Sequence, residues 1–243
     1  MTAASVMKSA LDELGAEAQV YLPNRFTDGY GPNRDVYQYY IKNENINLII
    51  TVDNGVAGLE AITWAQENGV DVIVTDHHSI PDQLPPAYAI VHPEHPDSQY
   101  PFKYLAVVGV AFKVACALLE YAPSEMLDLV TIGTIADMVS LTDENRILVA
   151  HGLKVLAQTE RAGLQELMKY AGVDFDKITE ETVGFQIAPR LNALGRLDDP
   201  NPAIELLQGW DEDEAHEIAK LIDQKHSEQK EIVEKIHNAA LSM

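Results

Sequence analysis

Asp71-Val72-Ile73-Val74-Thr75-Asp76-His77-His78 is the stretch that decides the fold. A run of apolar and β-branched residues, ended by charged groups and then by Ser79-Ile80-Pro81, predicts a central strand buried on both faces, as in a parallel sheet. Open α/β sheets place their ligands at the carboxyl ends of such strands. The aspartate and the two adjacent histidines are therefore the leading candidates for a functional site.

The segments on either side predict an α/β fold with a parallel sheet flanked by helices. Residues 47–52 are expected to form a second buried strand and residues 87–91 a third, with a helix at residues 56–68 between the first two. Strands and helices that alternate at this spacing indicate crossover units. Further upstream we expect three elements: a helix at 3–14, a strand at 18–22 and a helix at 35–42.

From about residue 105 the pattern becomes helical. The expected helices cover residues 107–121, 124–136, 145–157, 163–170 and 182–188. From residue 212 to about 240, charged residues of both signs surround a sparse apolar stripe. That pattern predicts a long, mostly solvated connecting helix.

Composition limits the classes of function. The chain has 243 residues, of which 47% are hydrophobic, and a formal net charge of −21. This acidity argues against a simple surface for phosphate backbones, although carboxylates in a cleft can hold divalent cations that reverse the local field. The single cysteine, Cys116, excludes an internal disulfide, and neither a signal peptide nor a membrane span is predicted. We therefore expect a cytoplasmic protein.

Five ionisable residues are expected to converge at one edge of the sheet. They are Asp53, Asp76, His77, His78 and Asp137. Carboxylates and imidazoles without a thiolate favour manganese, magnesium or zinc, and a carboxylate that bridges two ions would provide the geometry used for phosphoester hydrolysis. Each residue alone has an ordinary explanation, such as a turn cap or a helix end. The combination is more specific than any member.

Two further segments carry arginines. Residues 23–33 are rich in turn formers and contain Arg25, which fits a surface loop and a phosphate-contacting loop equally well. Near Gly195, Arg190 and Arg196 follow the helix expected at residues 182–188.

Several motifs resemble a known family. Three of them look like signature motifs of the DHH phosphoesterase superfamily: Thr51-Val-Asp53-Asn-Gly55, Val74-Thr-Asp76-His77-His78 and Gly133-Thr-Ile-Ala-Asp137. Other stretches resemble its RecJ-like branch of single-stranded-DNA-specific exonucleases: Tyr21-Leu-Pro-Asn-Arg25-Phe with Gly29-Tyr-Gly31, Tyr100-Pro-Phe-Lys103 before Val108-Gly-Val-Ala-Phe-Lys113, Asp143-Glu-Asn-Arg146, and Pro189-Arg190-Leu-Asn-Ala-Leu-Gly-Arg196. The resemblance covers nearly the whole chain.

The resemblance implies a reaction and a role for each motif residue. It implies hydrolysis of single-stranded DNA from the 5′ end, with a water activated between two divalent ions, usually Mn²⁺ or Mg²⁺. By motif position, Asp53 would bridge the ions, and His77 and Asp137 would bind one of them. Asp76 would be a ligand or a support for the ligands, and His78 would face the scissile phosphate.

The same resemblance extends to DNA contacts and to partners. Arg25, Arg190 and Arg196 match basic positions of the family's motifs and are candidates for phosphate contacts, because forked guanidinium donors suit a phosphate. Single-stranded DNA is the implied substrate, in DNA repair and recombination. A single-strand-binding protein and a helicase are partners implied by resemblance only, and no membrane is involved.

Two departures from the family pattern matter. An Asp-x-Asp motif, whose aspartates bind both ions, normally precedes the residues that match Met1-Thr2-Ala3-Ala4, and a DHHA1-type domain normally follows the long helix. We therefore expect residues 1–209 to be a DHH catalytic domain shortened at its N-terminus. Residues 210–243 are expected to connect it to a missing domain. One metal site should be weakened and activity impaired.

Two alternatives remain open. A DHH-family phosphodiesterase for short oligonucleotides or cyclic dinucleotides resembles this chain at Asp-His-His but not at the Gly-Tyr-Gly and Pro-Arg-Leu-Asn segments. A preference for dinucleotides over long strands would favour it. The other alternative is a degenerate DHH fold that serves as a non-catalytic scaffold, which complete absence of manganese binding would favour.

Overall fold

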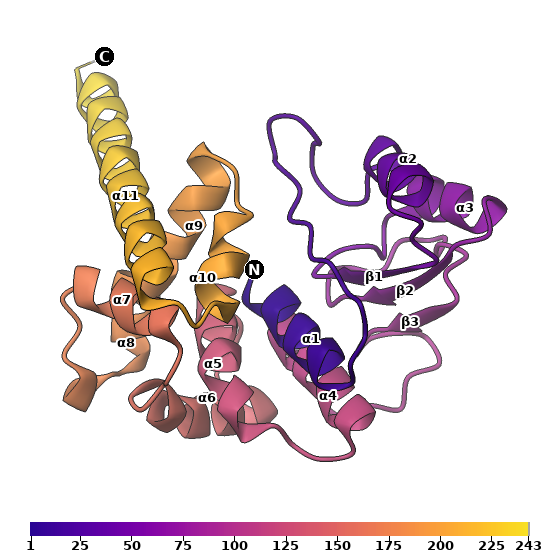
Figure 1. Cartoon of the computed structure of the whole chain (residues 1–243), viewed down its shortest axis with the longest axis horizontal. Helices are drawn as coiled ribbons and strands as arrows, with labels where there is room; N and C mark the ends of the chain where they lie inside the picture. The colour runs from indigo at the N-terminus through magenta and orange to yellow at the C-terminus, as the bar shows by residue number, and fades with distance from the viewer. Residues whose placement is uncertain (243) are drawn as a thin grey trace.

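A small parallel sheet lies beside a larger group of helices in the computed structural model, which describes residues 1–242 (Figure 1). The strands are β1 (Leu48–Val52), β2 (Asp71–Thr75) and β3 (Ala89–Val91), in the order β1-β2-β3. Both pairings are parallel, so β2 is central. The predicted α/β class and the central position of the Asp-His-His strand are confirmed.

Two helices flank the sheet. The chain crosses from β1 to β2 through α3 (Leu59–Glu67), and α2 (Arg34–Asn43) packs against α3. A small hydrophobic core lies between α3 and the sheet, and its buried members are Ile62, Ala65, Val70, Val72 and Val74. The outer strand β1 is less buried than predicted, since Leu48 is 42% exposed.

The helical half contains the main hydrophobic core. Its elements are α1 (Thr2–Glu13), α4 (Val107–Leu119), η1 (Ser124–Met126), α5 (Leu127–Ala136), α6 (Asp143–Leu156), α7 (Ala162–Tyr170), η2 (Phe175–Lys177), α8 (Glu180–Thr182), η3 (Val183–Ile187), α9 (Ala188–Leu197), α10 (Pro202–Gln208) and α11 (Glu212–Leu241). The N-terminal helix α1 packs against α4 and α5 and so belongs to this half. The predicted change to helices after residue 105 is confirmed.

Two predicted boundaries are wrong. The helix expected at residues 56–68 begins at Leu59, because residues 55–58 form a turn in which the Gly58 N–H donates to the Gly55 carbonyl at 2.8 Å. The helix expected at residues 182–188 extends much further, through α8, a π-helical turn (η3) and α9. Both Arg190 and Arg196 therefore lie on α9.

The strand predicted at residues 18–22 is also wrong. Its backbone has no strand partner among the described residues. The Leu22 N–H donates instead to Asn201 Oδ1 at 2.9 Å, and Asn201 Nδ2 donates to the Leu22 carbonyl at 3.1 Å. An extended, β-branched or aromatic sequence becomes a strand only when a neighbouring strand accepts its hydrogen bonds.

The long helix α11 leaves the helical half towards the C-terminus (Figure 1). Its first turn is capped by Asp211, whose side chain accepts from the Glu214 N–H. Its buried residues end at His226, and the described residues beyond position 230 are exposed, as a solvated helix requires. Met243, the last residue of the predicted connecting segment, lies outside the described residues. None of the described helices combines the length and apolar character that a membrane crossing needs.

Candidate metal centre

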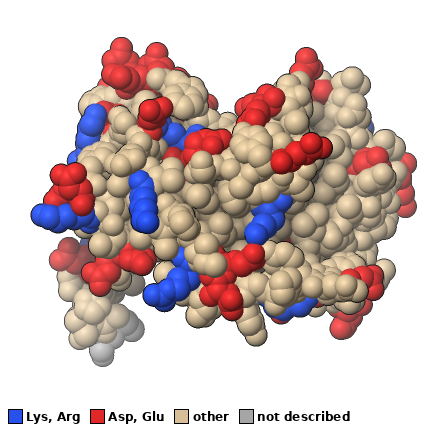
Figure 2. Space-filling model, turned by 90° about the horizontal axis from the view of Figure 1, so that it is seen from below, with Lys and Arg blue, Asp and Glu red and all other residues tan. Residues whose placement is uncertain are grey.

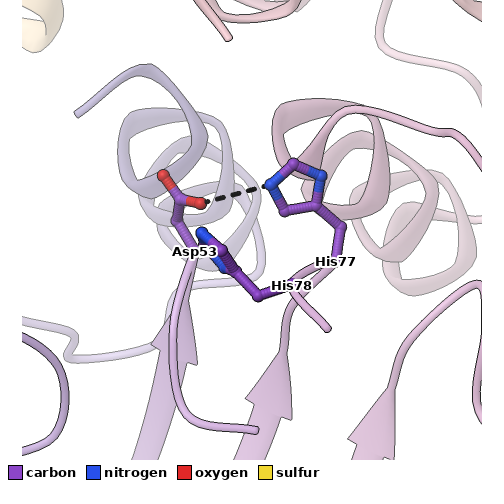
Figure 3. Close-up of side chains that lie close together, drawn as sticks. All are labelled: Asp53, His77 and His78. Carbon is purple, nitrogen blue, oxygen red and sulfur yellow. Dashed lines mark ion pairs between the residues drawn. The ribbon is translucent and has the colours of Figure 1, made fainter. Parts of the chain in front are cut away.

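The site is built on the carboxyl ends of two adjacent strands. Asp53 follows β1, and its N–H continues the ladder by donating to the Thr75 carbonyl at 3.0 Å. The Asp-His-His residues follow β2, and Figure 3 shows that Asp53, His77 and His78 come together above these strand ends. Gly55 allows the chain to turn sharply after Asp53: its φ is +115°, and a Cβ there would lie 2.4 Å from Thr51 Oγ1.

Three predicted ligands from distant parts of the sequence meet at this edge. His77 Nε2 lies 3.7 Å from Asp53 Oδ1 and 3.5 Å from Asp137 Oδ2. Asp137 comes from the C-terminal end of α5 in the helical half. One ligand atom each from Asp53, His77 and His78 lie within 4.8 Å of one another. The site therefore joins both halves of the molecule.

Both carboxylate oxygens of Asp76 are occupied by hydrogen bonds from protein groups. It is 1% exposed, and its Oδ2 accepts from the Val56 N–H at 3.0 Å. Its Oδ1 accepts from the N–H groups of His77 and His78 at 2.8 and 3.2 Å, and from His78 Nδ1 at 2.7 Å. Of the two roles considered for Asp76, this arrangement favours support of the neighbouring histidines over metal ligation.

Asp53 and Asp137 place two carboxylates beside His77, an arrangement that favours binding of a cation. Burial raises the pKa of Asp53, and the Asp137 carboxylate raises it further, while the Met1 amino group and His77 partly oppose the shift. Burial alone would lower the pKa of His78, but the hydrogen bond to Asp76 and the negative charges of Asp76, Asp53 and Asp137 together raise it above its ordinary value. Because the donors are carboxylate oxygens and imidazole nitrogens, they fit Mn²⁺ or Mg²⁺.

His92 is a site residue that the sequence reasoning missed. It follows β3 directly, at the same edge of the sheet, and is 4% exposed. Its Nδ1 accepts from the Glu94 N–H at 3.0 Å, so Nε2 carries the proton and donates to the His78 carbonyl at 2.8 Å. The sequence contains a signal for it, because His92 directly follows the strand predicted at residues 87–91, and open α/β sheets place their ligands at such strand ends.

The three predicted DNA-contacting arginines have different environments. Arg25 is exposed on the 23–33 loop, with its guanidinium carbon 5.6 Å from the Tyr30 ring centroid. Arg190 is engaged within the protein. Its Nε donates to Asp223 at 2.8 Å and its Nη1 to the Gln186 carbonyl at 2.6 Å.

Arg196 is exposed near the end of α9. On the face of the molecule drawn in Figure 2, lysine and arginine side chains lie apart among many acidic ones. No continuous basic band runs across that face.

Comparison with known proteins identifies the family. The family described as DHH family, N-terminal domain, matches residues 1–134. The single-stranded-DNA-specific exonuclease RecJ of Bacillus subtilis (strain 168) is 50% identical over 243 residues, which are 100% of this chain and 31% of that protein.

Two solved structures are also similar. A crystal structure of exonuclease RecJ bound to manganese superposes with a TM-score of 0.88 at 32% identity, over 99% of this chain and 62% of the other. A structure of RecJ in complex with Mn²⁺ from Thermus thermophilus superposes with a TM-score of 0.85 at 31% identity, over 100% of this chain and 35% of the other. The chain thus spans only part of the length of each relative. Since the family match extends over more than half of the chain, the chain belongs to the DHH family.

Proposed function

We propose that this chain provides the catalytic DHH unit of a RecJ-like exonuclease, which hydrolyses single-stranded DNA from the 5′ end with Mn²⁺ or Mg²⁺. The observation that carries the proposal is the meeting of His77 with Asp53 and Asp137 at distances of 3.7 and 3.5 Å. The relatives named RecJ, and the solved RecJ structures that contain manganese, support the same substrate class and metal.

Asp53, His77 and Asp137 are the residues that would hold divalent ions. Bound ions of this kind supply a water with a lowered pKa and neutralise charge on a phosphate. Asp76 holds His78 through the ring Nδ1 at 2.7 Å. With Nδ1 held by Asp76, the Nε2 of His78 would be the ring nitrogen that faces an oxygen of the scissile phosphate.

The remaining parts of the proposal rest on the resemblance. Residues 1–209 would form the catalytic unit, and residues 210–243 would connect it to a further domain. We propose a cytoplasmic role in DNA repair and recombination, with a single-strand-binding protein and a helicase as candidate partners. A phosphodiesterase for dinucleotides and a non-catalytic scaffold are less favoured, because all of the chain aligns with RecJ and Asp53, His77 and Asp137 lie together.

Two measurements test the function. Binding of Mn²⁺ to the chain is followed by electron paramagnetic resonance, with Asp53→Asn as the variant that should lose it. Nuclease activity is measured in the chain and in a chimera in which its 243 residues replace the matching segment of the Bacillus subtilis RecJ. The substrates are a long single strand, its duplex and a dinucleotide.

We expect the chain to bind Mn²⁺, and the chimera to remove nucleotides stepwise from the 5′ end of the single strand in preference to the duplex. A preference for the dinucleotide would replace the exonuclease with the short-substrate phosphodiesterase. Absence of both Mn²⁺ binding and hydrolysis would leave only the scaffold.

A further inference from the structure

The Leu22–Asn201 contact ties the Arg25 loop to the helical half. The Asn201 carboxamide makes two hydrogen bonds to the backbone of Leu22, one accepted at 2.9 Å and one donated at 3.1 Å, across a sequence separation of 179 residues. A side-chain amide that pairs with both polar groups of a peptide copies the bonding of a strand partner. We call this pair of hydrogen bonds the clasp.

The loop held by the clasp is organised around Asp28. The Tyr21 hydroxyl and the Asn24 N–H donate to Asp28 Oδ2 at 2.5 and 2.8 Å, and Asn33 Nδ2 donates to the Asp28 carbonyl at 2.6 Å. Only Pro23 and Asn24 separate Leu22 from Arg25, and proline has a fixed φ. The backbone of Arg25 therefore follows the position of Leu22 closely.

The other side of the clasp is equally well anchored. The Asn201 N–H and Nδ2 both donate to Asp199 Oδ1, at 3.0 and 2.7 Å. Asp198 forms an ion pair with Lys225 of α11 at 3.0 Å. Pro200, which directly precedes Asn201, is buried. This short segment follows α9 directly, so Asn201 is held at a constant place relative to Arg196 near the end of that helix.

We propose that Asn201 is a positioning residue, which through the clasp sets the place of Arg25 relative to Arg196 so that one DNA backbone meets both guanidinium groups. This inference rests on the proposed function. A phosphate chain binds two arginines without extra ordering cost only if their separation is already established. Among the described residues, the clasp supplies the only hydrogen bonds between residues 18–33 and the helical half.

The test uses Asn201→Ala, with Asn68→Ala as the matched control. Asn68 is exposed at the end of α3, and its amide bonds only the Trp64 carbonyl of the same helix. The probe is a 5′-phosphorylated oligodeoxythymidylate, titrated in Mg²⁺ at several salt concentrations. Hydrogen–deuterium exchange of residues 22–33 is measured on the same proteins.

For Asn201→Ala we expect faster exchange in residues 22–33 and a Kd about fivefold to tenfold higher, the size of one lost hydrogen bond. The slope of log K against log salt should fall by about one, as for the loss of one phosphate contact. A merely structural role would weaken binding without changing this slope. Mn²⁺ affinity and the Asn68→Ala control should be unchanged.

A double-mutant cycle with Arg25→Gln decides between direct and indirect action. If the clasp acts through Arg25, adding Arg25→Gln to Asn201→Ala should cost little further affinity. Additive losses, an unchanged salt slope or unchanged exchange would each overturn the inference while the proposed function stands. Failure of the unaltered chain to bind the oligonucleotide would overturn both.

Discussion

The edge of the sheet and the arginine-bearing segments are held in place by different means. At the edge, Asp53 and Asp76 continue the hydrogen-bonded ladder, with backbone bonds to Thr75 and Val91. Strand register therefore sets the positions of Asp53 and Asp76, while Asp137 is brought to the same edge by α5. Arg25 lies on a loop and is exposed beside Tyr30, whereas Arg190 lies on α9 and is paired with Asp223.

The difference teaches that backbone pairing positions chemistry more directly than surface side chains do. A strand end has little freedom once its neighbour is chosen, whereas a long arginine side chain on a helix can face DNA or pair with a neighbouring acid. Substitutions at the two regions should therefore differ in kind. Changes at the sheet edge should abolish a function, and changes at single arginines should only weaken it.

The largest effect is expected for Asp53→Asn. If Asp53 is a metal ligand as proposed, removing its charge should abolish Mn²⁺ binding at one site and lower nuclease activity by about a hundredfold or more. Metal titration and single-turnover hydrolysis measure the two effects. Asp71→Asn, at the opposite end of β2 where the side chain is exposed, is the matched control. Equal losses in both variants would show that the sheet edge is not a metal centre.

Asp76→Asn should be the most destabilising substitution of the site. The carboxylate is 1% exposed and accepts four hydrogen bonds. In asparagine an NH₂ group replaces one of its oxygens, and this group cannot accept the hydrogen bonds that the oxygen accepted. We expect the free energy of unfolding to fall by about 2–4 kcal/mol, measured by urea denaturation. A loss below that of the Asp71→Asn control would contradict the support role.

The same residue predicts a pH effect with a definite sign. Burial alone would raise the pKa of Asp76, but hydrogen bonds from Val56 and His78 lower it below the ordinary value in the folded protein. Its stabilising contribution is therefore complete above the unfolded pKa, about 3.9 for aspartate, and is lost as pH falls through the folded pKa. Stability measured between pH 6 and pH 3 should decrease less steeply in Asp76→Asn than in the unaltered protein.

Substitutions of His92 test whether the functional site includes the end of β3. His92→Phe removes the donor to the His78 carbonyl and should lower the hydrolysis rate about tenfold to a hundredfold, in the range found for residues that orient a site. His92→Asn keeps a donor and should restore part of the rate, while Mn²⁺ affinity stays unchanged in both. Equal rates for the two variants would sink the orienting role.

The smallest effects are expected at the arginines, and they should differ from one another. Arg25→Gln removes an exposed guanidinium and should raise the Kd for single-stranded DNA about tenfold or less, with a lower salt slope. Arg190→Gln breaks the pair with Asp223 and should lower thermal stability more than DNA affinity. The reverse order would show that Arg190 leaves its acidic partner to bind DNA.

The sequence predicted most of the architecture because periodicity reports local burial. The run from Asp71 to Thr75 and the helices after residue 105 were recognisable for that reason. The strand expected at residues 18–22 failed because strand formation needs a partner, and the hydrogen bonds of Leu22 go to a side chain instead. The role of His92 was accessible but unrecognised, because a single histidine carries little signal without its hydrogen-bond partners.

By itself, the sequence determined the class of fold, the central strand and the identity of the residues at its end. A β-branched run, a turn glycine and adjacent ionisable groups are local properties of the chain. The sequence also predicted that Asp137 would join His77, but only the tertiary structure decided the distance between them, the hydrogen bond by which Asp76 holds His78, and the pairing of Arg190. These are contacts between residues distant along the chain, and they depend on packing that no local pattern encodes.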